Sequence, residues 1–138
     1  AHSVPENYLK QGEPYLKHTE KTVELVMKKI GSQQPWTLSF QSKVGPVKWL
    51  EPLTDQVIRD LGKKGKRQIL LVPVSFVSDH IETLYELDIL YKQTAQEAGI
   101  EHFARAPAFN TMPSFISALA DIVAEKLIKV NGASKKAK

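Results

Sequence analysis

The chain has 138 residues, a formal charge of +4 and no cysteine, with 42% hydrophobic and 25% charged residues. This length and composition are typical of one globular domain with its own core, and no apolar run approaches the roughly 20 residues that cross a membrane. Without cysteine, disulfides, zinc–thiolate sites and cysteine-bound iron–sulfur clusters are excluded, so a metal ion would need histidine, carboxylate or backbone oxygen ligands.

The positive charge is concentrated in two places, 63–67 and 135–138. A nucleic-acid interface would need aromatic side chains or a known reader motif beside these clusters, and neither is present. We therefore predict a solvated surface, a disordered basic tail over 131–138 and no nucleic-acid partner. Weak contact with an anionic partner or a membrane surface is the alternative.

Helical and strand-like patterns alternate along the chain. Helical spacing of apolar residues, with glycine or asparagine at the ends, predicts four helices: 14–31, 54–62, 79–98 and 113–131. Thr54 is the expected cap of the second helix, and the last helix is expected to bury one apolar face: Phe115, Ile116, Leu119, Ile122, Val123 and Leu127. Period-two alternation or a continuous apolar run predicts three strands: 36–41, 69–74 and 102–108.

The resulting order, α-β-α-β-α-β-α, predicts an α/β fold. Strands that alternate with helices imply right-handed crossovers, a parallel sheet and helices on both of its faces. Ligands in such folds bind beyond the carboxyl ends of the strands. This rule indicates three loops: 42–52, 75–82 and 109–113.

The second of these loops opens a segment, 78–88, that combines four carboxylates with a histidine. On an α-helix Asp79, Glu82 and Glu86 would share a face, and close carboxylates need a cation, a proton or water between them. A metal site or a proton relay that includes His80 is one interpretation. The other is an acidic helix N-terminus stabilised by the helix dipole, which explains Asp79 and Glu82 better than Glu86 and Asp88.

The loop that follows the first predicted strand is a second candidate. Ser42 and Lys43 could bind an anionic group, and Trp49 could stack on a flat ligand. The alternative is a surface loop whose tryptophan packs on the core. Phe76, by itself, is expected to be a packing residue, and His2, taken alone, gives little indication of a function.

Three motifs together resemble the ferrochelatases, enzymes that insert ferrous iron into protoporphyrin IX to make protohaem. The motifs are Ala1-His2-Ser3-Val4-Pro5, Gln41-Ser42-Lys43-Val44-Gly45-Pro46 with Trp49-Leu50, and the run from Pro73 to Asp88. The match continues in register from Ala1 to about Leu127. It implies a Rossmann-like three-layer αβα domain over 1–130, the carboxyl-terminal half of a two-half enzyme whose porphyrin lies between the halves.

The resemblance also implies roles for single residues. His2 and Glu82 match the pair that binds the metal and accepts pyrrole protons on opposite sides of the porphyrin. Asp79, His80 and Glu86 match a polar track that conducts protons or metal away from the site. The porphyrin pocket would be formed by the four residues that match its wall and rim: Ser42, Lys43, Trp49 and Phe76.

The chain departs from the family in its length. We expect the other half of the enzyme to be missing, together with much of the porphyrin pocket, and the isolated chain to be inactive. Ferrous iron is then a substrate, and no iron–sulfur cluster is expected. The resemblance implies a cytoplasmic protein, with possible membrane association, in a bacterium, or a mitochondrial or plastid protein in a eukaryote.

Two other functions stay open at this point. One is a half-sized tetrapyrrole chelatase that works as a homodimer, so that a twofold interface rebuilds the cleft. The other is a haem-binding or metal-binding module without catalysis. It would bind a porphyrin without metallating it, and its affinity would survive the change Glu82→Gln.

Overall fold

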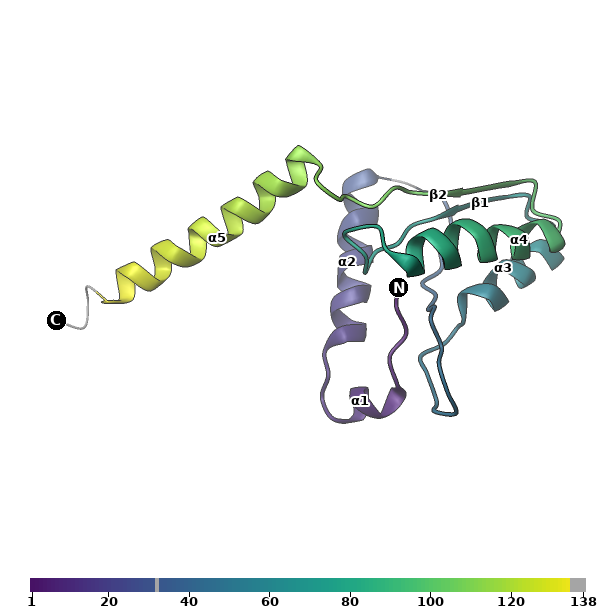
Figure 1. Ribbon diagram of the computed structural model, residues 1–138, viewed down its shortest axis with the longest axis horizontal. Helices are drawn as coiled ribbons and strands as arrows, with labels where there is room; N and C mark the ends of the chain where they lie inside the picture. The colour runs from purple at the N-terminus through teal and green to yellow at the C-terminus, as the bar shows by residue number, and fades with distance from the viewer. Residues whose placement is uncertain (32, 135–138) are drawn as a thin grey trace. The chain divides into compact units, whose positions relative to one another are not determined.

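The computed structural model of the chain describes residues 1–31 and 33–134 and divides into two compact units, Ala1–Ala108 and Phe109–Lys138. The single predicted domain over 1–130 is therefore seen as two parts. The elements of the first unit are α1 (Glu6–Lys10), α2 (Tyr15–Ile30), α3 (Thr54–Lys63), β1 (Gln68–Leu71), the wide helix η1 (Glu82–Leu90), α4 (Tyr91–Glu97) and β2 (His102–Arg105) (Figure 1). The second unit contains α5 (Pro113–Ser134).

The two strands form a parallel sheet in which Gln68 lies opposite His102 and Leu71 lies opposite Arg105. The predicted α/β class and the parallel pairing are thus confirmed. The strand predicted over 36–41 forms isolated parallel bridges instead, from Phe40 to Leu53 and from Gln41 to His2. Its backbone groups bond to two different short segments on its two sides, so no continuous ladder develops.

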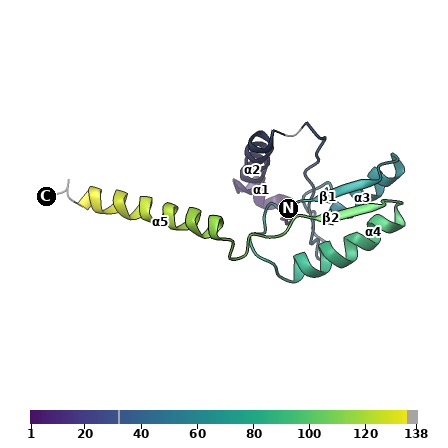
Figure 2. The ribbon, with the colours of Figure 1, turned by 90° about the horizontal axis from the view of Figure 1, so that it is seen from above.

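The core lies on one face of this sheet, where α3, η1 and α4 pack together (Figure 2). Its buried members come from these helices and from the segment after α4: Ile58, Leu87, Tyr91, Ala95 and Ile100. Ile69 and Leu71 of β1 point toward this core, whereas Leu70 is 66% exposed. The burial of β1 on both faces that the apolar run predicted is wrong for the described residues, because the helices of the first unit pack on one face.

Two residues near α3 have roles other than those predicted. Gly62 does not end the helix: a Cβ at this position would lie 2.2 Å from the Ala98 carbonyl oxygen, so the glycine permits close packing of α3 against α4. Leu53, rather than Thr54, is the N-cap residue, and the Thr54 hydroxyl donates to Ser39 Oγ at 3.0 Å.

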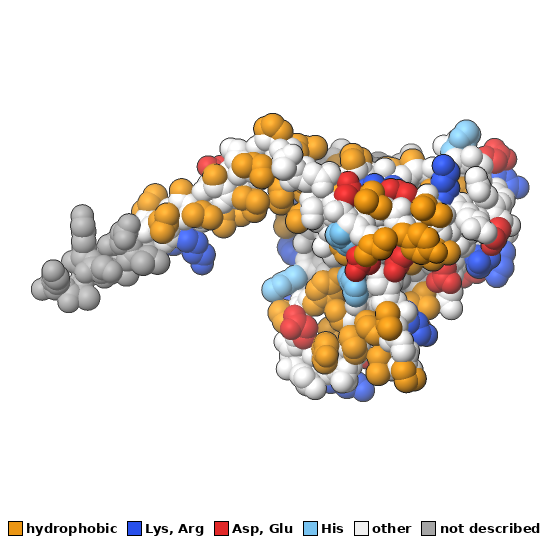
Figure 3. All heavy atoms as spheres, in the orientation of Figure 1, with side chains coloured by type: hydrophobic (Ala, Val, Ile, Leu, Met, Phe, Trp, Pro, Cys, Tyr) orange, Lys and Arg blue, Asp and Glu red, His pale blue; other side chains and the backbone are white. Residues whose placement is uncertain are grey.

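Within the second unit, α5 continues to Ser134, beyond the predicted end at Asn131 and Gly132. One glycine costs a helix only about 1 kcal/mol relative to alanine and need not end it. The predicted basic tail therefore begins inside this helix, and 135–138 lie outside the described residues. Five of the six residues predicted as its buried face are exposed in the structure (Figure 3): Ile116, Leu119, Ile122, Val123 and Leu127.

None of the described helices, α5 included, combines the length and the apolar character that crossing a bilayer requires.

Candidate functional site

The acidic segment forms a different helix from the one predicted. Asp79 and His80 precede the helix, and Glu82 to Leu90 form η1, a π-helix with wider turns than an α-helix. Long π-helices are rare, and short ones are frequent at functional sites. Because Asp79 lies before the helix, the predicted helical face shared by Asp79, Glu82 and Glu86 is not formed as a whole, and the three carboxylates have different partners.

Two of the carboxylates, Asp79 and Asp88, are joined by Arg105 at the end of β2. The guanidinium Nε and Nη2 donate to the two oxygens of Asp88 at 2.6 and 2.8 Å, and Nη1 donates to Asp79 Oδ1 at 3.0 Å. The Arg105 side chain is only 12% exposed. The bidentate bond to Asp88 is the largest cause that raises the pKa of Arg105, so the cation is permanent.

Arg105 was missed as a site residue by reasoning from the sequence. The predicted strand 102–108 placed Arg105 in its middle, whereas the observed β2 ends at Arg105, at the carboxyl end of a parallel strand where ligand-binding side chains gather. The four carboxylates in the sequence indicated that a bound metal ion or proton would be needed between them. The protein itself supplies a cation, Arg105, for two of them.

The third carboxylate, Glu82, pairs with the preceding histidine. His80 Nδ1 lies 2.6 Å from Glu82 Oε2, and each side chain is 35% exposed. At this distance Nδ1 donates to the carboxylate, so it has no lone pair left to accept from the Glu82 N–H, which lies 3.3 Å from the same nitrogen. The pKa of Glu82 is lowered, most by a hydrogen bond from its own backbone N–H and next by the bond to His80. The carboxylate is therefore ionised at neutral pH.

Phe76 lies near both His2 and His80. The ring centroids of His2 and Phe76 are 6.1 Å apart, and those of Phe76 and His80 are 4.7 Å apart in an edge-on contact. His2 is also among the groups whose charge lowers the pKa of Glu82. His2 Nδ1 lies 2.5 Å from the Ser3 carbonyl oxygen, which can only accept, so Nδ1 carries the proton and Nε2 is left as a base or a metal ligand.

The fourth carboxylate, Glu86, is held by neutral donors. Gln41 Nε2 and Ser42 Oγ each donate to Glu86 Oε2 at 3.0 Å, and Gln41 Nε2 also lies 3.2 Å from the Glu82 carbonyl oxygen. Gln41 is buried. Ser42 has a positive φ of 65°, and its hydroxyl group faces η1. Gln41 was not predicted as a site residue, although it lies in the quoted motif.

Glu86 also lines a pocket of about 270 Å³ beside η1 and α4. Ser42 and Lys43 lie at this pocket with Arg59 and Tyr91. Burial raises the pKa of the Tyr91 phenol, so the hydroxyl stays protonated. On one side, Glu86 is thus linked through Gln41 to the backbone carbonyl oxygen of Glu82. On the other side, it is open to solvent through the pocket.

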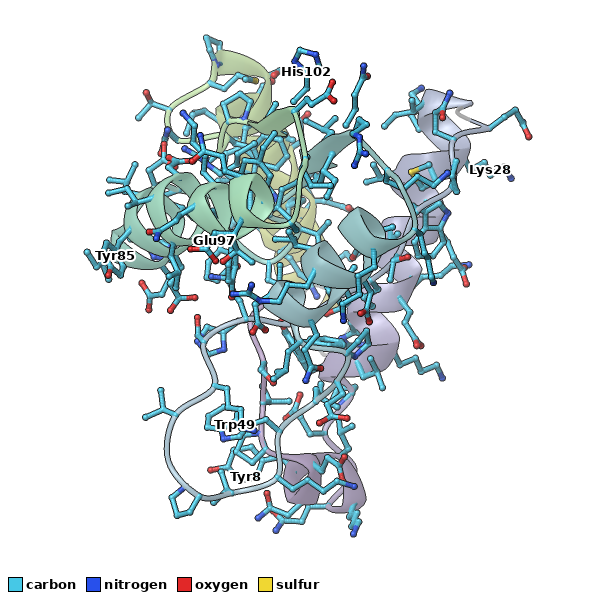
Figure 4. The ribbon with its side chains drawn as sticks, turned by 90° about the vertical axis from the view of Figure 1, so that its right-hand side faces the viewer. Tyr8, Lys28, Trp49, Tyr85, Glu97 and His102 are labelled. Atoms are coloured by element: carbon cyan, nitrogen blue, oxygen red, sulfur yellow. The ribbon has the colours of Figure 1, made fainter. Side chains whose placement is uncertain are left out.

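The loop that contains Trp49 folds back on itself. Trp49 Nε1 donates to the Val44 carbonyl oxygen at 3.0 Å, and the indole is half-buried at the end of the unit that also contains α1 (Figure 4). Trp49 is therefore not part of the central core. Lys43 is exposed, so it can contact an anion. The Ser42 hydroxyl already donates to Glu86 and is less able to do so.

No described residues bring three or more histidine, aspartate or glutamate side chains close enough together to hold a metal ion. The structure brings His2, Phe76, His80 and Glu82 together and places Glu86 one hydrogen-bonded step beyond. Asp79 lies apart from that chain of contacts, bound to Arg105 and to the Thr83 hydroxyl.

Comparison with known proteins gives one consistent result. A family model described as ferrochelatase matches residues 1–127. A ferrochelatase of Geotalea uraniireducens is 54% identical over 123 residues, and one of Synechococcus sp. strain RCC307 is 50% identical over 128 residues. These alignments cover 89% and 92% of the chain but only 38% and 33% of the relatives, so the chain spans little more than a third of their length.

Proposed function

The chain belongs to the ferrochelatase family, and from that premise we propose that it forms part of an enzyme that inserts ferrous iron into protoporphyrin IX. The observation that carries the proposal is the ionised Glu82, bonded to His80 at 2.6 Å and within electrostatic reach of His2. These residues lie in a chain whose residues 1–127 match the family model.

Metal insertion must remove two N–H protons from the centre of the porphyrin. A base has to reach each of them, and a distorted ring exposes its nitrogen lone pairs better than a flat one. We assign these two roles to His2, whose Nδ1 rather than Nε2 contacts the Ser3 carbonyl oxygen, and to Glu82. Ferrous iron accepts both imidazole and carboxylate ligands, so the same two residues are proposed to contact the incoming iron.

A relay away from Glu82 is proposed through the neighbouring polar groups. His80 is bonded to the Glu82 carboxylate and is the proposed proton carrier, while Gln41 holds Glu86 beside this pair by donating to Glu86 and to the Glu82 backbone carbonyl oxygen. Glu86 then lines the open pocket. Asp79 is the least favoured member of the proposed relay, because its carboxylate is already bonded to Arg105.

The porphyrin is proposed to contact four residues around this centre: Ser42, Lys43, Trp49 and Phe76. Phe76 lies near the His2 and His80 rings, where an aromatic side chain can support a macrocycle. Lys43 is the exposed cation of the set and is suited to a propionate. Because the relatives with these alignments are bacterial, we propose the cytoplasm as the location, with the membrane surface as a possible peripheral contact.

The activity is proposed for the larger enzyme and not for this chain alone. The chain matches little more than a third of its relatives, and a macrocycle needs walls on both of its faces. We predict that the purified chain inserts ferrous or zinc ions into protoporphyrin at the uncatalysed rate, measured by porphyrin absorbance. Turnover comparable to that of an intact ferrochelatase, from a stable dimer in sedimentation, would instead support the homodimeric chelatase.

The decisive experiment is a chimera. The whole chain replaces the matching segment of the Geotalea uraniireducens ferrochelatase, to which it is 54% identical. We expect the chimera to form protohaem, and a folded chimera that cannot do so would overturn the proposal. If it binds porphyrin tightly without metallating it, and Glu82→Gln leaves that affinity unchanged, the chain is a porphyrin-binding module.

A further inference from the structure

The hydroxyl of Tyr15 joins two segments that contribute to the candidate site. It lies 2.8 Å from the His2 carbonyl oxygen and 2.8 Å from Ser75 Oγ, residues that are 13 and 60 positions away along the chain. Tyr15 is half-buried at the first position of α2.

The direction of these two hydrogen bonds follows from their chemistry. A phenol has one proton, and the His2 carbonyl oxygen can only accept, so the Tyr15 hydroxyl donates to His2. The same oxygen then accepts the proton of the Ser75 hydroxyl. The three groups form a directed chain from Ser75 through Tyr15 to His2, and such chains strengthen each bond cooperatively.

The bond to His2 adds to the contacts that hold residues 1–5, which pair with Gln41 and, from Ser3 onward, with residues 48–50. Gln41 accepts from the Ser3 N–H at 2.8 Å and donates to the Ala1 carbonyl oxygen at 2.9 Å. In this parallel bridge, the carbonyl group of His2 itself points away from Gln41. Tyr15 satisfies that carbonyl group, so the peptide that carries the His2 imidazole is held from both sides.

The bond to Ser75 fixes the turn that carries Phe76. Ser75 directly precedes Phe76, whose ring lies near both histidines, with centroid distances of 6.1 Å to His2 and 4.7 Å to His80. A shift of the 73–77 turn relative to residues 1–3 would change the contact between Phe76 and His2. Tyr15 thus fixes residues 1–3 relative to the turn that leads into the His80–Glu82 pair.

We propose that Tyr15 is a positioning residue for the reaction: it holds His2 at the distance from Glu82 that proton removal on both sides of the porphyrin requires. This inference rests on the proposed function. Misplacement of a reacting group by about 1 Å can cost up to about 100-fold in rate, whereas the affinity for the porphyrin depends on other contacts.

The test is Tyr15→Phe in the Geotalea chimera, with Tyr8→Phe as the matched control. Tyr8 is a 50% exposed tyrosine on α1 (Figure 4). We expect Tyr15→Phe to lower kcat about tenfold and to leave KM for protoporphyrin within twofold, while Tyr8→Phe changes neither. Ser75→Ala, which keeps the bond to His2, should lower kcat by a smaller factor.

A Tyr15→Phe chimera that keeps kcat within twofold overturns the positioning role. So does one whose KM for protoporphyrin rises while its kcat is unchanged. If Tyr15→Phe does not fold, Ser75→Ala decides alone: an unchanged kcat overturns the proposal. An inactive parent chimera is a different result, since it contradicts the proposed function itself.

Discussion

Asp79 and Asp88 differ from Glu82 and Glu86 in what neutralises them, although all four lie on one short segment. Arg105 binds the two aspartates with three hydrogen bonds and is 12% exposed. The two glutamates face a histidine, a glutamine and a serine. One pair is thus tied by a permanent cation, while the other retains partners that can exchange protons.

This difference separates stability from chemistry within the same segment. A carboxylate bound bidentately to arginine is poorly suited to accept a proton, because protonation would break a charge-assisted pair. A carboxylate bonded to an imidazole can exchange a proton with it. The aspartates are therefore expected to hold η1 against β2, and the glutamates to carry out the reaction.

The largest expected effect is on the glutamate side. Glu82→Gln keeps the size of the side chain but removes the base, so the chimera should lose at least about 100-fold in kcat. Glu20→Gln, on the exposed surface of α2, is the control. Absorbance assays of zinc and ferrous insertion measure both variants, and a Glu82→Gln chimera with nearly normal turnover would remove the distinction between the two pairs.

The next largest effect is on the aspartate side and concerns stability. Arg105→Met leaves two partly buried carboxylates without their cation and should cost about 2 kcal/mol of unfolding free energy. Both tryptophans lie in the first unit, so tryptophan fluorescence during urea unfolding of the chain reports its stability.

The control for Arg105→Met is Arg59→Met. Arg59 pairs with Glu97 at 3.5 Å, and both side chains are 49% exposed, so its loss should cost less than about 1 kcal/mol. Equal losses for the two variants would show that Arg105 contributes no more than a surface ion pair.

The smallest effect is a pH dependence that belongs to Glu82 and not to exposed acids. Its pKa is lowered in the folded state. Its contribution to stability is therefore fully present above the unfolded pKa of about 4.3 and is lost as the pH falls through the lower folded value. The difference in unfolding free energy between wild type and Glu82→Gln should be largest above roughly pH 5 and shrink below pH 4.

Much of the fold followed from patterns that are local in the sequence. The helical repeat of apolar residues predicted α2 and α3, and the apolar run that contains Ile69 and Leu71 predicted a strand that pairs in parallel. Periodicity did not predict α1, which has five residues and no buried face. It also could not distinguish η1 from an α-helix, because the same apolar residues fit both over a few turns.

The candidate site divides in the same way. Residue types and order were enough to select Asp79, His80, Glu82, Glu86 and His2 as a family motif, since these positions are fixed along the chain. Arg105, Tyr15 and Gln41 were not selected, because their contacts reach 26, 60 and 45 residues along the chain.

The sequence by itself therefore determined the alternation of helices and strands, the family and the identity of the acidic segment. Only the tertiary structure decided which acids are held by arginine, which face a histidine, and which tyrosine bonds to both His2 and Ser75. The physical reason is that charge pairing and hydrogen bonding depend on distances of about 3 Å between side chains, and chain folding alone brings residues so far apart in sequence to that distance.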